Sequence, residues 1–399
     1  MTQERLVPGS LFGGMLLVAG SCIGAGMLAL PILTGLAGFF PSLTMLLISW
    51  GFMTFTGLLL VEVNGWFKKQ INLVSMAQES LGQKGRYTAW ITYLFLFYSL
   101  LVAYTAASGS IFSAIIDSLF HISLPPSAAS IFFTALFGYI VYLGTRPVDL
   151  FNRVLMVGLI ITYLGMIALG ISRIDTELLL HTAPQYTFLS LPVLVVSFGF
   201  QNMIPSLTAY MKGDLKRVRL TILGGGLITF IIYLMWSLLV LGVVEPSSIA
   251  KSYAKGEEAT IALRAVLGSS AISHFSQGFA FFAIITSFLA QGLTLTHFLA
   301  DGFKLAPTRK NLPWLCTLAL LPPLILALYN PQIFFRALSF AGGICAMILF
   351  GILPISMAWV GRYIRKHSSH YHVSGGKPAL LFALLFSLFV IGCEVARFF

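Results

Sequence analysis

Charged residues are scarce in this chain of 399 residues. Asp, Glu, Lys and Arg together make up 9% of it, whereas a soluble domain carries about 25%. Hydrophobic residues make up 58%, and the apolar runs are repeatedly about 20 residues long, the length that an α-helix needs to cross a bilayer. The low fraction of charged residues therefore excludes a chain of several soluble domains. It indicates one polytopic membrane protein.

Cysteine and the signatures of enzyme sites are also sparse. The four cysteines lie within or at the edge of apolar runs, and their spacing matches neither a metal site nor a disulfide framework. No H-E-x-x-H, G-x-S-x-G or Walker motif is present, and the GGG at 224–226 does not precede Lys-Ser/Thr. We therefore expect no catalytic residues, no metal and no cofactor.

Eleven apolar spans are expected, all of them helical, because backbone amides cannot stay unpaired in lipid. A membrane β-barrel would need alternating segments of about ten residues, and the runs are continuous. The fold class is therefore all-α, in a single membrane domain over residues 1–399. The expected spans cover residues 9–35, 41–62, 87–113, 128–144, 152–172, 187–210, 220–244, 272–301, 313–329, 334–361 and 378–398.

The basic residues predict the orientation of these spans. With the N-terminus placed in the cytoplasm, 18 of the 24 Lys and Arg residues fall in cytoplasmic segments and 6 fall outside. Such a bias is typical of cytoplasmic loops, so we expect the N-terminus inside and the C-terminus outside. The net charge of +11 lies in these short loops, and we expect no nucleic acid partner.

The longest outside segment, residues 245–271, carries apolar residues at helical spacing, among them Ile261, Ala265 and Leu267. We expect a surface helix there. It is either a simple connector or an external lid over a substrate path.

The first span contains a stretch that weakens a helix. Residues 20–31 read GSCIGAGMLALP, with three glycines and a proline, and glycine loosens a helix while proline removes a backbone donor. Gly20 and Gly24 alone could serve close helix packing as a GxxxG pair. However, the sixth span has a similar stretch at mid-membrane, SFGFQNMIPSLTAY at 197–210.

Paired interruptions in two halves of a membrane protein indicate a binding site built from discontinuous helices. An offset of five spans inverts the second half, so we expect one repeat over about 9–172, a second over about 187–361, and an extra helix at about 378–398. Half-helix N-termini attract a carboxylate, and freed carbonyls attract an ammonium group or a cation. A zwitterionic amino acid carries both charges, which points to a small-molecule cargo.

At these residues the sequence resembles the bacterial hydroxy/aromatic amino acid permeases, the tyrosine- and tryptophan-specific transport proteins of the amino acid–polyamine–organocation superfamily. The motifs are GSCIGAGMLALP, SFGFQNMIPSL, and TSFLAQGLTLTHFLADGF at 286–303. The resemblance covers essentially the whole chain and implies inverted five-helix repeats. It also implies import of aromatic amino acids with protons across the inner membrane. Many members carry a His and a Gly where this chain has Gln201 and Asn202, neither of which titrates near neutral pH. The resemblance therefore does not extend to a proton-coupling histidine at that place.

Candidate substrate-binding residues lie at the two interruptions, in the third span and in the eighth. For each of them, ordinary packing is the alternative. They are Ser21, Cys22, Gly24, Ala25, Gly26, Ser197, Phe198, Gly199, Phe200, Gln201, Asn202, Tyr98, Tyr104 and Gln291.

Candidate ion-coupling residues are fewer. Thr286 and Ser287 could hold a sodium ion together with carbonyls of the first span, since hard cations prefer oxygen ligands, or they could simply bond back to their own helix. His297 and Asp301, one turn apart, and Glu62 could carry a proton, or they could be ordinary charges at helix ends. Protons are the preferred coupling ion, and sodium is the rival.

Three functions therefore stay open. The preferred one is import of aromatic amino acids, tyrosine first and tryptophan second. The others are a permease for other neutral amino acids, and a membrane-embedded enzyme or channel.

Overall fold

The computed structural model describes residues 9–67, 71–268, 271–305, 308, 310–367 and 371–397. Four basic residues that entered the charge bias, Arg5, Lys68, Lys69 and Arg309, lie outside these ranges, as does the final residue of the last expected span. Across the described ranges the chain is helical and contains no strand. Ten helices are long and apolar enough to cross a membrane, or eleven when one bent pair is counted as a single span. The all-α membrane fold is thus confirmed.

Eleven membrane-spanning units match the expected spans. In chain order they are α1 (Leu11–Cys22) with α2 (Gly26–Gly35), α3 (Phe39–Asn64), α4 (Leu73–Phe120), α5 (Pro126–Leu143), α6 (Thr145–Gly170), α8 (Leu191–Ser197) with α9 (Ile204–Tyr210), α10 (Leu215–Val243), α13 (Ala271–Gly302), α14 (Leu312–Tyr329), the continuous run of α15 (Phe334–Phe340), η4 (Ala341–Ile352), α16 (Leu353–Trp359) and η5 (Val360–Ile364), and α17 (Gly376–Val395).

Six short elements lie between or within these units. They are η1 (Ile171–Arg173), α7 (Thr176–Leu179), η2 (Pro184–Ser190), η3 (Gln201–Met203), α11 (Pro246–Lys255) and α12 (Ala259–Leu267).

The first span is broken at the expected place. Helix α1 ends at Cys22 and α2 begins at Gly26, and the two halves meet at an angle of 63°. Pro31 is not the cause of the break, because it lies inside α2. The break therefore falls on the glycine-rich part of the stretch, where the backbone is least restricted.

The sixth span is interrupted as well. Helix α8 ends at Ser197, three non-helical residues and the short η3 follow, and α9 resumes at Ile204. Pro205 occupies the first turn of α9, where the missing amide donor costs nothing. The prediction of discontinuous first and sixth spans is thus confirmed.

The third span is longer than expected. Helix α4 begins at Leu73, well before the predicted start at residue 87, and Asn72 caps it by accepting a hydrogen bond from the Ser75 amide. Gly82 interrupts the helix with a φ of 75°, a conformation that favours glycine. The residues before Gly82 were missed because they are not apolar enough to read as a span.

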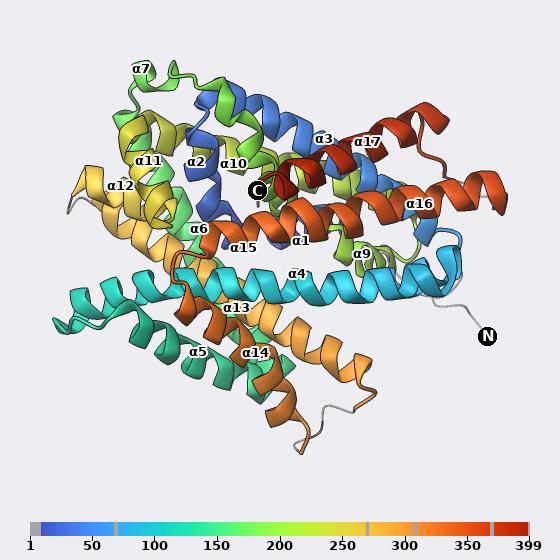
Figure 1. Cartoon of the computed structure of the whole chain (residues 1–399), viewed down its shortest axis with the longest axis horizontal. Helices are drawn as coiled ribbons and strands as arrows, with labels where there is room; N and C mark the ends of the chain where they lie inside the picture. Colours follow the sequence, from blue (N-terminus) through green and yellow to red (C-terminus); the bar gives the residue numbers. More distant parts are fainter. Residues whose placement is uncertain are drawn as a thin grey trace.

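Two groups of helices flank α4 (Figure 1). Helices α5, α13 and α14 pack on one side of it, and α15 and η4 pack on the other. The interrupted first span packs mainly against α10, and α8 packs against η4 and α3. The breaks in both interrupted spans therefore lie inside the bundle.

The segment 245–271, expected on the outside, forms two short helices where a single one was expected. Gly256, with a φ of 72°, separates α11 from α12, and both helices pack against α2. The residues of α2 from Met27 to Gly35 are all buried. Helices α11 and α12 thus cover α2, the second half of the first span.

Candidate functional site

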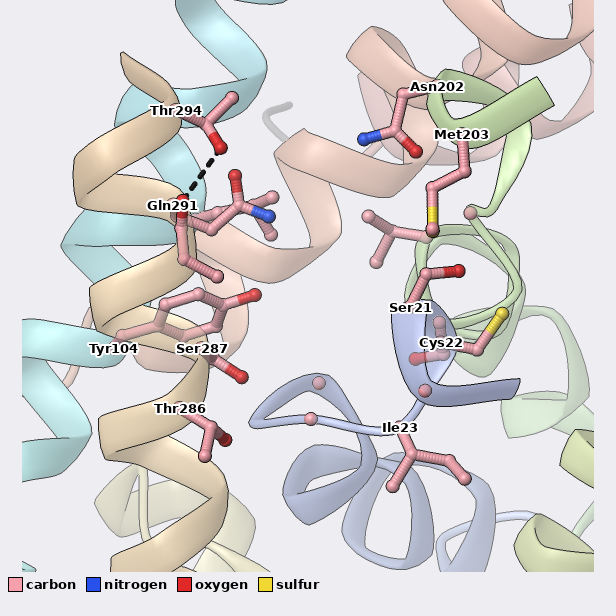
Figure 2. A pocket seen from close by; sticks show the side chains of 18 of the residues that line it. Ser21, Cys22, Ile23, Tyr104, Asn202, Met203, Thr286, Ser287, Gln291 and Thr294 are labelled. Carbon is pink, nitrogen blue, oxygen red and sulfur yellow. Dashed lines mark hydrogen bonds between the residues drawn. The ribbon is translucent and has the colours of Figure 1, made fainter. Parts of the chain in front are cut away.

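One cavity of about 480 Å³ lies between the two interrupted spans, α4 and α13. On one wall, Tyr104 projects from α4 beside Thr286, Ser287 and Gln291 of α13 (Figure 2). The opposite wall carries polar and sulfur-bearing side chains from both interrupted spans, namely Ser21, Cys22, Asn202 and Met203. The cavity thus joins the two breaks predicted from the sequence.

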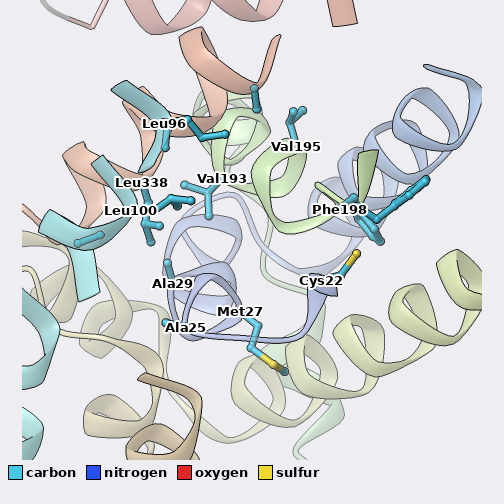
Figure 3. Close-up of a cluster of buried hydrophobic side chains, with 14 of the residues drawn as sticks. Cys22, Ala25, Met27, Ala29, Leu96, Leu100, Val193, Val195, Phe198 and Leu338 are labelled. Carbon is cyan, nitrogen blue, oxygen red and sulfur yellow. The ribbon is translucent and has the colours of Figure 1, made fainter. Parts of the chain in front are cut away.

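Another part of the cavity wall is apolar. It is formed by Leu96, Phe97 and Leu100 of α4, Leu338 of α15 and Phe350 of η4. Leu96 and Leu100 also lie beside Val193 and Ala29 in a buried hydrophobic cluster (Figure 3). Moving an aromatic ring from water to these side chains would be favourable, because burial of apolar surface stabilises by about 25 cal/mol per Å².

None of these five apolar residues was predicted from the sequence. A signal was present for two of them, because Leu96, Leu100 and Tyr104 recur every four residues and so share one face of α4. Asn152 and Met156 of α6, also four residues apart, line the cavity and were missed as well. For Phe350 the sequence offers no comparable cue.

The break in the first span is bonded to α13. The Ala25 amide donates a hydrogen bond to the Ser287 hydroxyl at 2.8 Å. A Cβ atom on Gly24 would lie 2.5 Å from that hydroxyl oxygen, whereas one on Gly20 would meet nothing closer than 3.9 Å. The close approach of Ser287 thus explains why residue 24 is a glycine, but no neighbour requires glycine at position 20. Gly20 and Gly24 therefore do not act as a GxxxG packing pair here.

Thr286 is bonded within its own helix. Its hydroxyl donates to the backbone carbonyl of Phe282 at 2.8 Å and lies 3.1 Å from that of Ala283. Both Thr286 and Ser287 line the cavity. Their oxygens keep free lone pairs, but each hydroxyl already has a structural partner.

Three polar atoms of the cavity-lining residues are buried without a hydrogen-bond partner among the described residues: Ser197 Oγ, Gln291 Oε1 and Asn152 Oδ1. A buried polar atom without a partner costs about 1–3 kcal/mol. These atoms are therefore poised to bond to a polar molecule that enters the cavity.

Several predicted site residues do not line the cavity. The Gln201 amide donates to the backbone carbonyl of Met53 at 3.1 Å and to the Thr56 hydroxyl at 3.3 Å, both on α3. Tyr98 donates to the Leu318 carbonyl on α14. The others are fully packed inside the protein, namely Ala25, Phe198 and Phe200.

One residue that the sequence did not reveal touches both breaks. The hydroxyl of Tyr233, on α10, lies 2.6 Å from the Cys22 carbonyl oxygen and 2.8 Å from that of Ser197. One turn later, Trp236 donates its indole N–H to the Met27 carbonyl at 2.9 Å. Helix α10 therefore supplies donors to the backbone of both interrupted spans.

The ionisable ion-coupling candidates lie outside the cavity. Glu62 forms a buried two-pronged ion pair with Arg362, at 2.8 and 2.5 Å, and also accepts the Val373 amide. His297 and Asp301 are exposed on α13, and no ion pair joins them. The described residues that line the cavity include no Asp, Glu, His, Lys or Arg.

Two interrupted membrane helices that meet across one cavity are typical of transporters, and the described residues that line the cavity form no catalytic cluster. The comparison with known families agrees: residues 8–394 match the model of the tryptophan/tyrosine permease family. The chain belongs to that family.

Relatives of known name cover nearly the whole chain. Tyrosine-specific transport system 2 of Haemophilus influenzae is 34% identical, over 95% of this chain and 95% of the relative. The tryptophan-specific transport protein of the same organism is 30% identical, over 97% and 96%.

A solved structure, MhsT in complex with L-phenylalanine, superposes with a TM-score of 0.64 at 12% identity. It covers 98% of this chain and 100% of its own. At this identity the likeness concerns the fold alone. The protein is thus a multi-pass membrane transport protein and not an enzyme.

Proposed function

We propose that this protein imports aromatic amino acids across the bacterial inner membrane by cation symport. Tyrosine is the first candidate cargo and tryptophan the second, as in the names of the relatives. The observation that supports the proposal is the cavity that joins the two helix breaks and has both polar and apolar walls.

The amino acid backbone fits the broken helices. The positive N-terminal end of α2, at Gly26, attracts the carboxylate. The unpartnered Ser197 hydroxyl oxygen accepts from the ammonium group. A Cβ atom on Gly26 would lie 3.3 Å from that oxygen, so the two groups are close enough to hold one small zwitterion.

The ring fits the apolar wall formed by Phe97, Leu100 and Phe350. Edge-to-face contacts with Phe side chains stabilise a bound ring by about 0.5–1.5 kcal/mol beyond area burial. A serine side chain would leave this part of the cavity unfilled. The shape therefore supports an aromatic cargo over a small neutral one.

The two halves of the first span support an inward-facing state. The cavity is lined by Leu16, Leu17 and Gly20 of α1, whereas α2 from Met27 onward is buried and covered by α11 and α12. With the N-terminus in the cytoplasm and the C-terminus outside, the cavity opens toward the cytoplasm and the outside segment acts as a closed lid.

Protons remain our choice of coupling ion. Both hydroxyls of the rival sodium site have structural partners, Ser287 at the Ala25 amide and Thr286 at the Phe282 carbonyl. Glu62 is held by Arg362, so His297 and Asp301 are the remaining candidates of the three named from the sequence. They lie on α13 one and two turns beyond Thr294, which lines the cavity.

The test is uptake of labelled amino acids into proteoliposomes at a fixed membrane potential. We expect tyrosine or tryptophan to accumulate when a pH gradient is imposed, and serine and leucine to accumulate far less. Equal uptake of leucine would favour the neutral amino acid permease. Accumulation that follows a sodium gradient and ignores the pH gradient would contradict proton coupling and assign the ion to Thr286 and Ser287.

A further inference from the structure

The two breaks share one hydrogen-bond donor. Cys22 is the last residue of α1 and Ser197 is the last residue of α8. Their carbonyl oxygens lie 2.6 and 2.8 Å from the same oxygen, the Tyr233 hydroxyl. Tyr233 is fully buried, and its ring packs edge-to-face on Phe198 with the centroids 5.2 Å apart. The ring position is therefore fixed as well as the hydroxyl.

A hydrogen-bond donor is needed where the ends of α1 and α8 meet, because both ends carry partial negative charge. A helix C-terminus carries about half a negative charge, and here two of them converge on one buried point. Transporters with discontinuous helices place a cation at such carbonyl groups. In this chain a neutral hydroxyl lies there, and its single proton is shared between the two carbonyls.

We propose that Tyr233 is a positioning residue of the transport site, whose hydroxyl holds the ends of α1 and α8 in the relative position that binds the substrate. This inference rests on the proposed function, because it assumes that the cavity between the two breaks takes an amino acid. It assigns a role in transport to α10, which the cavity lining does not reveal.

The chain provides two matched controls. Tyr163 donates its hydroxyl to the Ile232 carbonyl at 2.9 Å, and Tyr98 donates to the Leu318 carbonyl at 2.8 Å. Each joins two helices as Tyr233 does, but the acceptors lie inside the unbroken helices α10 and α14. A tyrosine-to-phenylalanine change at each position removes one hydroxyl and little else.

The experiment compares Tyr233→Phe, Tyr163→Phe and Tyr98→Phe in purified protein. It measures the Kd for labelled tyrosine and tryptophan, and the KM and maximal rate of uptake. We expect Tyr233→Phe to raise Kd and KM about tenfold or more, since two buried carbonyls lose their donor, whereas the controls stay within about twofold of the wild type. A purely structural role would lower the yield of folded protein in all three variants without separating their Kd values.

An unchanged Kd in Tyr233→Phe, or an equal rise in the two controls, would overturn the inference. If the wild type binds no aromatic amino acid, the proposed function fails instead, so the two failures are distinguishable. Should Tyr233→Phe not fold, 3-fluorotyrosine placed at position 233 keeps the ring and hydroxyl but makes a stronger donor. We then expect the Kd to change at least threefold relative to 3-fluorotyrosine at position 163, and equal Kd values would contradict the proposal.

Discussion

The Ser287 hydroxyl oxygen lies 2.8 Å from the backbone nitrogen of Ala25 and accepts its hydrogen bond. The bond joins α13 to the gap between α1 and α2, and it gives an acceptor to an amide outside either helix. Non-helical backbone inside a membrane protein persists only where such partners exist. The break in the first span is therefore supported by a side chain more than 260 residues away.

Removing this acceptor tests its importance. We expect Ser287→Ala to lower the uptake rate at least tenfold, because the buried Ala25 amide is left without a partner. Thr296→Val is a suitable control on the same helix, since that hydroxyl bonds back to the Gly292 carbonyl of α13. Similar uptake by both variants would show that the bond across the gap does not matter.

The glycines at the break differ in the space around them. Gly24→Ala places a methyl group 2.5 Å from Ser287 Oγ, whereas Gly20→Ala meets nothing closer than 3.9 Å. We expect the first change to reduce uptake strongly and the second to leave most of it.

Leucine at Gly24 or Gly26 should abolish uptake without preventing membrane insertion. Full activity of Gly24→Leu and Gly26→Leu would place the substrate elsewhere.

The sequence was sufficient to predict the framework of this fold. Apolar run length gave the number of spans, and the pairing of two glycine- and proline-bearing stretches gave the discontinuous helices. Both signals are local, because a helix must satisfy its own backbone in lipid wherever it runs. The broken stretches at Cys22–Gly26 and Ser197–Ile204 agree with that prediction.

The side-chain directions were less predictable. After a non-helical break the helical phase is lost, so nothing in SFGFQN indicated that Gln201 would point to α3 while Asn202 lines the cavity. Tyr233 was missed for a related reason. Its role depends on two backbone carbonyls brought together only by the tertiary fold.

The buried pair of Glu62 and Arg362 yields a stability prediction. Their side chains are 1% and 4% exposed, so Glu62→Gln leaves a buried guanidinium without its counter-charge. We expect the free energy of unfolding to fall by about 3–5 kcal/mol. A thermal melt in detergent measures the change.

The exposed pair Asp149–Arg153 is the control. There, Asp149→Asn should lower the free energy of unfolding by less than about 1 kcal/mol. Equal effects at the two sites would contradict the structural role of the buried pair.

The buried carboxyl of Glu258 leads us to expect that stability depends on pH in the segment 245–271. Burial raises the pKa of this carboxyl above its ordinary value, although hydrogen bonds from Thr260 and the nearby charge of Arg264 act in the opposite direction. A carboxyl whose pKa is raised on folding favours the folded state below its ordinary pKa. That contribution is lost as the pH rises through the raised value. The melting temperature should therefore fall with rising pH in this window, and Glu258→Gln should flatten the fall. An identical pH profile in the variant would contradict the assignment.

A cryo-electron microscopy map of the protein with tyrosine or tryptophan bound tests the central claim most directly. We expect the carboxylate and ammonium groups between residues 22–26 and 197–202, and the ring against Phe97 and Phe350. Density for the amino acid anywhere outside this cavity would contradict the account.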